Sequence, residues 1–161
     1  MHTPPPWLVI TGGFFLGFTL FTVVIRLLVR GAVMTLRRRL AECLEPGATI
    51  QREDFRANYF GLESLGGWQL RGNGVLVLTD RALEFLMLWP RRRFRVPLAE
   101  VTGSALVRWH CGKSVGRDLL KVSFQAGDRE DAMAWFVPDA VAWKAALDAA
   151  LSRSGACGDD R

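Results

Sequence analysis

The residue types that most often perform catalysis are sparse in this chain. His2 and His110 are its only histidines, so a histidine-rich metal site cannot be assembled. His110 and Cys111 are neighbours, and neighbouring side chains in an extended strand point to opposite faces, so they do not form a base and nucleophile pair. The run CGKS at residues 111–114 is similar to the end of a phosphate-binding loop, but Val107 holds the earlier glycine position. We therefore expect no enzyme, no metal and no cofactor.

The densest cluster of charge is a set of arginines in a turn bracketed by two aromatic residues. The residues are Arg91, Arg92, Arg93 and Arg95, with Trp89 and Phe94. Guanidinium groups pair with phosphates, and aromatic rings favour the polar boundary of a bilayer, so the cluster suits a lipid headgroup region. The alternative is a solvated hairpin tip with gatekeeping charges. Nucleic acid is not an expected partner, because no stacking aromatics are interleaved along an extended basic groove.

An uncharged apolar run lies near the N-terminus. Hydrophobic residues make up 50% of the 161 residues and are concentrated there. Residues 7–25 carry no charge and as a helix reach about 28 Å, which matches the hydrocarbon core of a bilayer. A signal peptide begins with positive charge, whereas residues 1–6 contain no Lys or Arg and the run ends at Arg26. We predict a short tail, residues 1–6, followed by a retained single-pass transmembrane helix.

Positive charges after the apolar run predict its orientation. They are Arg26, Arg30, Arg37, Arg38 and Arg39. Because arginines beside a span are retained on the cytoplasmic side, we expect the N-terminus outside the cell membrane and the C-terminal domain in the cytoplasm. The odd number of cysteines, without metal-ligand spacing, agrees with reduced thiols: Cys43, Cys111 and Cys157.

A second helical pattern occupies residues 26–47. Apolar residues at alternating steps of four and three form one stripe: Val29, Val33, Leu36, Leu40 and Leu44. The sequence Glu-Pro-Gly at residues 45–47 ends it. Arg30, Arg37 and Arg38 lie off the stripe. This basic amphipathic helix is therefore expected either to lie along anionic headgroups or to dock on the protein's own domain, and charge patterning alone does not choose.

Two glycines inside the predicted span have the spacing of a helix association motif. Gly13 and Gly17 form a G-x-x-x-G step, and small residues at this spacing let two transmembrane helices approach closely. The step also arises by chance in apolar segments. It makes a homodimer, or a membrane protein partner, an expectation to test.

Residues 48–151 change to alternating periodicity, with turn residues at short intervals. Seven strands are predicted at residues 55–62, 75–79, 82–89, 94–96, 101–109, 119–125 and 132–137. A closing helix follows Pro138, with Ala140, Trp143, Leu147 and Leu151 on one side. The predicted fold class is an N-terminal transmembrane helix, an all-β domain of about seven antiparallel strands in a split barrel or sandwich, and one C-terminal helix. Residues 152–161 are predicted to be a disordered tail.

The run GVLVLTDRALEFL, residues 74–86, resembles the second and third strands of GRAM and bacterial PH-like domains, in which G-x-L-x-L-T-x-x-R-L-x-F is typical. Seven strands and one C-terminal helix are also that superfamily's layout. The resemblance covers roughly residues 48–151, and it implies binding of phosphoinositides, other anionic lipids or protein segments. Phosphoinositide-binding members carry basic residues around the first hairpin, where residues 62–74 offer only Arg71. This departure leaves residues 91–95 as the dense basic patch.

Two functions from different classes follow. The first is a membrane-anchored PH-like recognition module that binds anionic lipid headgroups, or an acidic protein segment, at the cytoplasmic membrane face through residues 91–95. The second is a structural or scaffolding subunit of a membrane complex, which associates through its transmembrane helix and has no small-molecule ligand.

Overall fold

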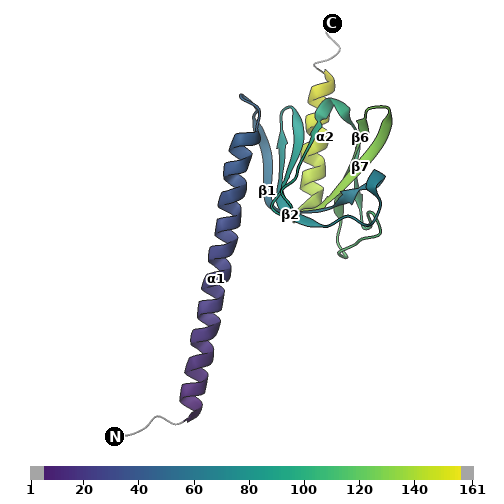
Figure 1. The fold of residues 1–161 in the computed structure, drawn as a ribbon. Coiled ribbons are helices and arrows are strands. Elements are labelled where there is room, and N and C mark those ends of the chain that lie inside the picture. Colours follow the sequence, from purple (N-terminus) through teal and green to yellow (C-terminus); the bar gives the residue numbers. More distant parts are fainter. Residues whose placement is uncertain (1–5, 157–161) are drawn as a thin grey trace.

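A single long helix precedes the β domain. The computed structural model describes the backbone of residues 6–156 and the side chains of residues 17–154. The predicted tail residues 1–5 and 157–161 lie outside this description. Helix α1 (Pro6–Cys43) leaves the domain as a shaft (Figure 1). The predicted span and the predicted juxtamembrane helix are therefore one continuous helix of 38 residues.

Seven antiparallel strands and a closing helix follow α1, so the predicted architecture is confirmed. The strands are β1 (Ile50–Leu62), β2 (Gly72–Thr79), β3 (Ala82–Met87), β4 (Arg93–Pro97), β5 (Val101–Val107), β6 (Leu119–Ala126) and β7 (Arg129–Phe136). Two short 3-10 helices, η1 (Glu63–Leu65) and η2 (Leu98–Glu100), lie in the connections. The sheet order is β4-β3-β2-β1-β7-β6-β5. Helix α2 (Ala140–Ala156) packs on β5 and β6 (Figure 1).

The C-terminal helix is longer than the sequence indicated. α2 continues to Ala156, although the predicted disordered tail began at Ser152. The hydroxyl of Ser152 donates to the carbonyl oxygen of Asp148 at 3.0 Å, so this residue is accommodated within the helix instead of ending it. Residues 152–156 are therefore helical.

Strand β1 joins the two halves of the sheet. Its first part pairs with β2 and its last part with β7, and its register shifts between Asp54 and Ala57 and between Tyr59 and Gly61. Such bulges bend a strand and increase its twist. Gly61 has a φ of +134°, a conformation that glycine adopts readily. The bent strand lets both halves curve around one inner face.

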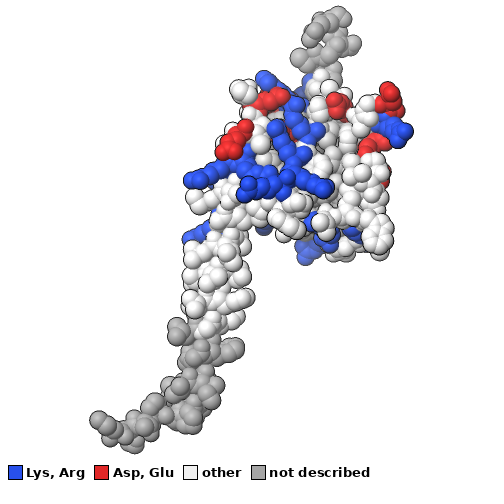
Figure 2. Space-filling view, viewed as in Figure 1, with Lys and Arg blue, Asp and Glu red and all other residues white. Residues whose placement is uncertain are grey.

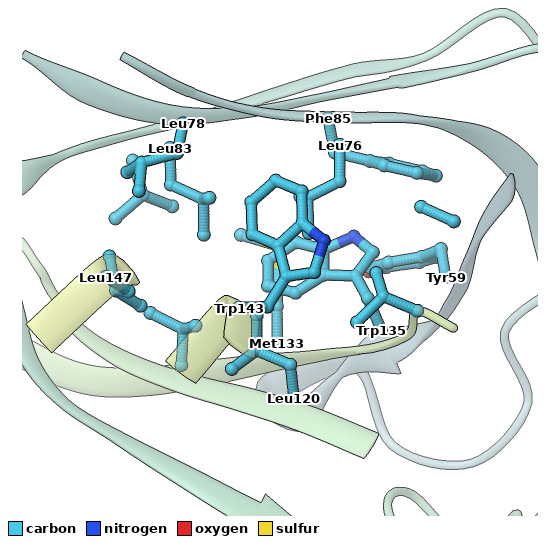
Figure 3. Packing of buried hydrophobic residues seen from close by; sticks show 14 of the residues in the cluster. Tyr59, Leu76, Leu78, Leu83, Phe85, Leu120, Met133, Trp135, Trp143 and Leu147 are labelled. Carbon is cyan, nitrogen blue, oxygen red and sulfur yellow. The ribbon is translucent and has the colours of Figure 1, made fainter. Parts of the chain in front are cut away.

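The inner face of the sheet and α2 enclose the main core (Figure 3). Trp143 projects from α2 into this core and is 1% exposed, near Trp135 of β7 and Leu120 of β6. The guanidinium of Arg52 lies over the Trp143 ring, 5.3 Å from its centroid. Trp143 thus fills the space between the sheet and the closing helix.

A second apolar cluster covers the outer face of β2 and β3. Leu36 and Leu40 of α1 are buried there, and they pack against Val75, Val77 and Leu86. The upper part of the apolar stripe of α1 therefore docks on the protein's own domain, one of the two alternatives that the sequence left open, whereas Val29 at its lower end is 58% exposed. Because β2 and β3 are covered on both faces, their sequences are nearly continuous apolar runs instead of alternating ones.

Candidate functional site

The predicted arginine cluster divides into two parts with different surroundings. Arg91 and Arg92 lie in the β3–β4 connection and are exposed, beside Trp89, which is 75% exposed. Arg93 and Arg95 lie in β4, where both contact Glu84. Arg93 and Arg95 are thus paired within the fold, although their side chains remain 36% and 35% exposed.

Arg93 and Arg95 surround a buried carboxylate on the outer face of β3. Glu84 is 2% exposed, and its Oε2 accepts hydrogen bonds from Arg93 Nε at 3.1 Å and Nη2 at 2.9 Å. Arg95 Nε lies 3.6 Å from Glu84 Oε1. A buried carboxylate needs such partners, because an unpaired charge inside a protein is costly. These two arginines therefore stabilise the buried carboxylate, and their place in the headgroup site stays a prediction.

The same two arginines hold the end of α1. Arg93 Nη2 donates to the carbonyl oxygen of Cys43 at 2.7 Å, and Arg95 Nη2 pairs with Glu45 at 2.5 Å. The last carbonyls of a helix lack intrahelical partners, and positive charge there complements the helix dipole. From the helix side, Arg39 Nη1 donates to the carbonyl oxygen of Met87 at 2.7 Å. Polar contacts therefore reinforce the apolar attachment of α1.

The two aromatic residues of the predicted cluster also separate. Phe94 stacks on Tyr59, with ring centroids 4.8 Å apart, and packs against the main core. Side chains alternate along a strand, so Phe94 points inward between two arginines that point outward. Phe94 is partly buried against the core, and its place at a lipid boundary stays a prediction. Trp89 is the aromatic residue that remains beside the exposed arginines.

The predicted juxtamembrane arginines lie at different places along α1. Four are exposed, namely Arg26, Arg30, Arg37 and Arg38, and Arg39 is partly buried. Arg37 lies over the ring of Phe55, 5.1 Å from its centroid. Arg37 and Arg39 therefore belong to the contact between α1 and the domain, while Arg26 and Arg30 lie nearer to the apolar shaft.

The lower shaft of α1 has the character of a membrane-crossing helix. Within Gly17–Cys43, an apolar stretch has a mean hydropathy of 1.8 and is 6% buried. On the face visible in Figure 2, the described shaft away from the domain shows no charged side chain. A helix of this length and composition could cross a membrane, and a signal sequence near an N-terminus has the same character. Gly17 is open, since a Cβ there would have nothing within 4 Å; the surroundings of Gly13 lie outside the described side chains.

His110 and Cys111 lie in a tight turn, not in the extended strand that the sequence indicated. Cys111 has a φ of +48°, and His110 and Lys113 exchange backbone hydrogen bonds. Burial lowers the pKa of His110, although its Nε2 bonds the carbonyl oxygen of Gly61 at 3.0 Å and Glu63 lies 3.7 Å from Nδ1. Burial also raises the pKa of the Cys111 thiol. Among residues 17–154, no three His, Cys, Asp or Glu side chains are grouped to hold a metal ion.

Two further exposed tryptophans were missed by the sequence reasoning. Trp68 lies in the β1–β2 connection and Trp109 in the β5–β6 connection, and they are 103% and 69% exposed. The signal that could have found them is a large aromatic residue inside a turn segment, where no core position is expected: Trp68 follows two glycines, and Trp109 is followed within three residues by Gly112. These connections are joined, because Lys113 Nζ donates to the carbonyl oxygen of Gln69 at 2.6 Å.

Comparison with known proteins supports the fold and nothing narrower. No family model and no curated protein matches the chain. The N-terminal PH domain of Vps36 is similar in structure, with a TM-score of 0.52 and 16% identity over 70% of this chain and 86% of that one. The C-terminal domain of an unknown protein from Leishmania infantum matches with a TM-score of 0.50 and 15% identity over 76% and 97% of the two chains.

A chain of the 8S snRNP assembly intermediate matches with a TM-score of 0.50 and 12% identity, over 68% of this chain and 85% of that chain. At such low identities these similarities show the fold alone. The domain has a PH-like fold. The narrower resemblance to GRAM domains rests only on the run at residues 74–86.

Proposed function

We propose that this chain is a membrane-anchored PH-like recognition module that binds anionic lipid headgroups through Arg91 and Arg92, with Trp89 beside them. The observation that carries the proposal is where the β3–β4 connection lies. Its Leu88 lines the same hollow as Leu28 of α1. Leu28 comes two residues after Arg26, or about 3 Å along the helix. The exposed arginines are therefore held close to the surface that the shaft would enter.

The proposed site is smaller than the cluster seen in the sequence. Arg93 and Arg95 are committed to Glu84 and to the end of α1, so two guanidinium groups remain for a ligand. Each basic residue near an anionic surface contributes about 1 kcal/mol, which salt screens. That attraction is weak for a soluble domain, but an anchored domain is already at high effective concentration near the bilayer.

Retention of α1 is part of the proposal. The shaft is continuous with the segment that packs Leu36 and Leu40 on the domain, and this continuity supports an anchor over a cleaved signal. The arginines that follow the apolar run support a cytoplasmic domain at the cell membrane. A reporter fused after Arg161 should therefore remain cytoplasmic. An exported reporter would refute this orientation.

Binding without catalysis is also part of the proposal. The imidazole of His110 is buried against the Gly61 carbonyl, and burial raises the pKa of the Cys111 thiol, the reverse of what activates a nucleophile. The GRAM-like assignment rests on the sequence run at residues 74–86. Self-association through Gly17 is also proposed, and the open space around a Cβ at that position supports it.

Amide hydrogen exchange of the full chain in nanodiscs tests headgroup binding. We expect residues 88–92 to exchange more slowly in discs that contain anionic lipid than in neutral discs, and added salt should reverse the difference. Arg91→Gln combined with Arg92→Gln should abolish the lipid dependence. The matched control removes the same charge from exposed arginines elsewhere, Arg129→Gln with Arg153→Gln, and should preserve it.

Two results of the exchange experiment would contradict headgroup binding by the β3–β4 connection. Equal exchange in neutral and anionic discs would refute headgroup recognition and favour an acidic protein partner or a scaffolding role. Loss of the lipid dependence in the control pair as well would show that net charge, not the β3–β4 connection, is responsible.

A further inference from the structure

We infer that the domain seats on the bilayer through a rim of exposed apolar side chains. The rim consists of Trp68, Trp89 and Trp109 with Leu65 and Leu70. All five are exposed large hydrophobic residues, and all lie in connections between strands. The inference rests on the proposed anchoring by α1 and adds the surface by which the domain contacts the membrane.

The rim lies at one end of the sheet. Strands β1 to β4 pair antiparallel in turn, so the β1–β2 and β3–β4 connections leave from the same end. The bend of β1 between its β2 and β7 partners brings the β5–β6 connection to that end as well. The Lys113 to Gln69 hydrogen bond joins two of these connections. The third begins at Leu88, whose backbone nitrogen donates to the carbonyl oxygen of Asn73 at the start of β2, at 2.8 Å. In Figure 1 this end of the domain faces the direction in which α1 leaves it.

The attachment of α1 sets the height of this end above a bilayer. A hollow of 470 Å³ is lined by Leu28 and Ala32 of α1 together with Gly74 and Leu88 of the domain. The uncharged run ends at Ile25, so Leu28 lies about 5 Å beyond it along the helix. The headgroup layer on each side of a bilayer is about 5 to 7 Å thick. The rim therefore lies at the depth of the headgroups when the shaft spans the hydrocarbon core.

The two ends of the domain differ in their exposed side chains: the rim end exposes large apolar residues. The turns at the opposite end carry charged residues, including Asp80, Arg81, Glu100 and Asp128. On the face visible in Figure 2, acidic side chains lie in the upper part of the domain, whereas basic ones are spread over its upper part, its middle and its lower margin. Tryptophan favours the membrane boundary because its ring is largely apolar and carries one polar N–H. At the rim end, the acidic side chains of Glu63 and Asp118 are paired with Lys121 and Arg108.

A bilayer fits this rim better than a protein partner does. The apolar rings are distributed over three separate connections and do not line one groove. The shaft that leaves the domain at the rim end also exposes large apolar side chains, such as Val24, Ile25 and Leu28. Arg71 follows the rim residue Leu70 and Arg108 precedes Trp109; both are exposed, and positive charge there complements anionic lipid.

Quenching by brominated lipid tests the inference on the full chain in nanodiscs. Trp7 lies in the predicted span, so the background variant is Trp7→Phe. In that background we expect brominated neutral lipid to quench at least a third of the tryptophan fluorescence. Replacing the three rim tryptophans with Ser should remove most of the quenching, because Trp135 and Trp143 are 1% exposed in the core. Adding Ile50→Trp to that variant places a reporter at the opposite end, and its emission should not be quenched.

The outcomes separate the rim from the proposed function. Quenching that is unchanged without the rim tryptophans, or equal at the Ile50→Trp reporter, would overturn the inference. Release of the chain from membranes by alkaline carbonate would instead refute the anchoring. Rim quenching in neutral lipid with no response of residues 88–92 to anionic lipid would support the rim and refute headgroup recognition.

Discussion

The division of the arginine cluster leads to a stability prediction that the sequence alone would not make. The perturbation is Arg93→Gln with Arg95→Gln, compared with Arg91→Gln and Arg92→Gln. Both pairs remove two positive charges from neighbouring positions. Only the first pair removes the partners of Glu84, which is 2% exposed.

The expected magnitude follows from burial. Removing one partner of a fully buried ion pair costs about 3 to 5 kcal/mol, because the remaining charge is left unpaired. The side chains of Arg93 and Arg95 are 36% and 35% exposed, so water reaches the site and reduces the cost to about 2 to 3 kcal/mol. For a domain of this size that corresponds to a fall in Tm of about 10 °C. The pair Arg91→Gln and Arg92→Gln should stay within about 0.5 kcal/mol of the parent.

The assay is thermal unfolding of the full chain in nanodiscs, followed by near-ultraviolet circular dichroism of the core tryptophans. A further variant adds Glu84→Gln to Arg93→Gln and Arg95→Gln, and it should recover part of the lost stability because no buried charge is then unpaired. Equal Tm values for the two arginine pairs would refute the structural role of Arg93 and Arg95. The absence of recovery with Glu84→Gln would show that the loss arises from the contacts with α1.

Three other measurements test the fold. A Cβ at Gly74 would overlap the Leu86 carbonyl oxygen, whereas a Cβ at Gly103 would have nothing within 4 Å. Gly74→Ala should therefore lower the free energy of unfolding by about 1 to 3 kcal/mol, and Gly103→Ala should leave it almost unchanged. Similar unfolding curves for the two variants would contradict the close approach at Gly74. Because burial lowers the pKa of His110, the unfolded chain binds a proton that the folded chain excludes. The free energy of unfolding should therefore decrease as pH falls below the ordinary value of 6.5 and level off below the folded pKa, and His110→Gln should remove this slope. Trp143→Ala should cost about 3 to 5 kcal/mol in denaturant unfolding by opening a core cavity, and a smaller loss would place that ring outside the core.

Much of the architecture could be predicted from the sequence because its signals are local. A turn residue or an alternating apolar pattern acts within a few positions, so all seven strands and the closing helix were located, with ends that differ by a few residues. The end of the long helix was also predictable from nearby residues. Gly47 has a φ of +80°, and glycine in this conformation commonly follows the end of a helix. The prediction that a disordered tail begins at Ser152 was wrong, because the alanine-rich helix α2 accommodates this serine.

The composition of the candidate site depended on contacts between distant residues. Arg93 meets the Cys43 carbonyl across 50 positions of sequence, and no local pattern distinguishes it from Arg91, which has the same side chain in the same charged run. Only the docking of α1 on β2 and β3 separates structural arginines from exposed ones and gives the domain a side that faces the shaft. The sequence by itself determined the helix, the strands and the abundance of arginine. The tertiary structure decided which arginines are paired and which tryptophans remain exposed. Burial and pairing depend on neighbouring side chains, and packing brings those neighbours together from distant parts of the chain.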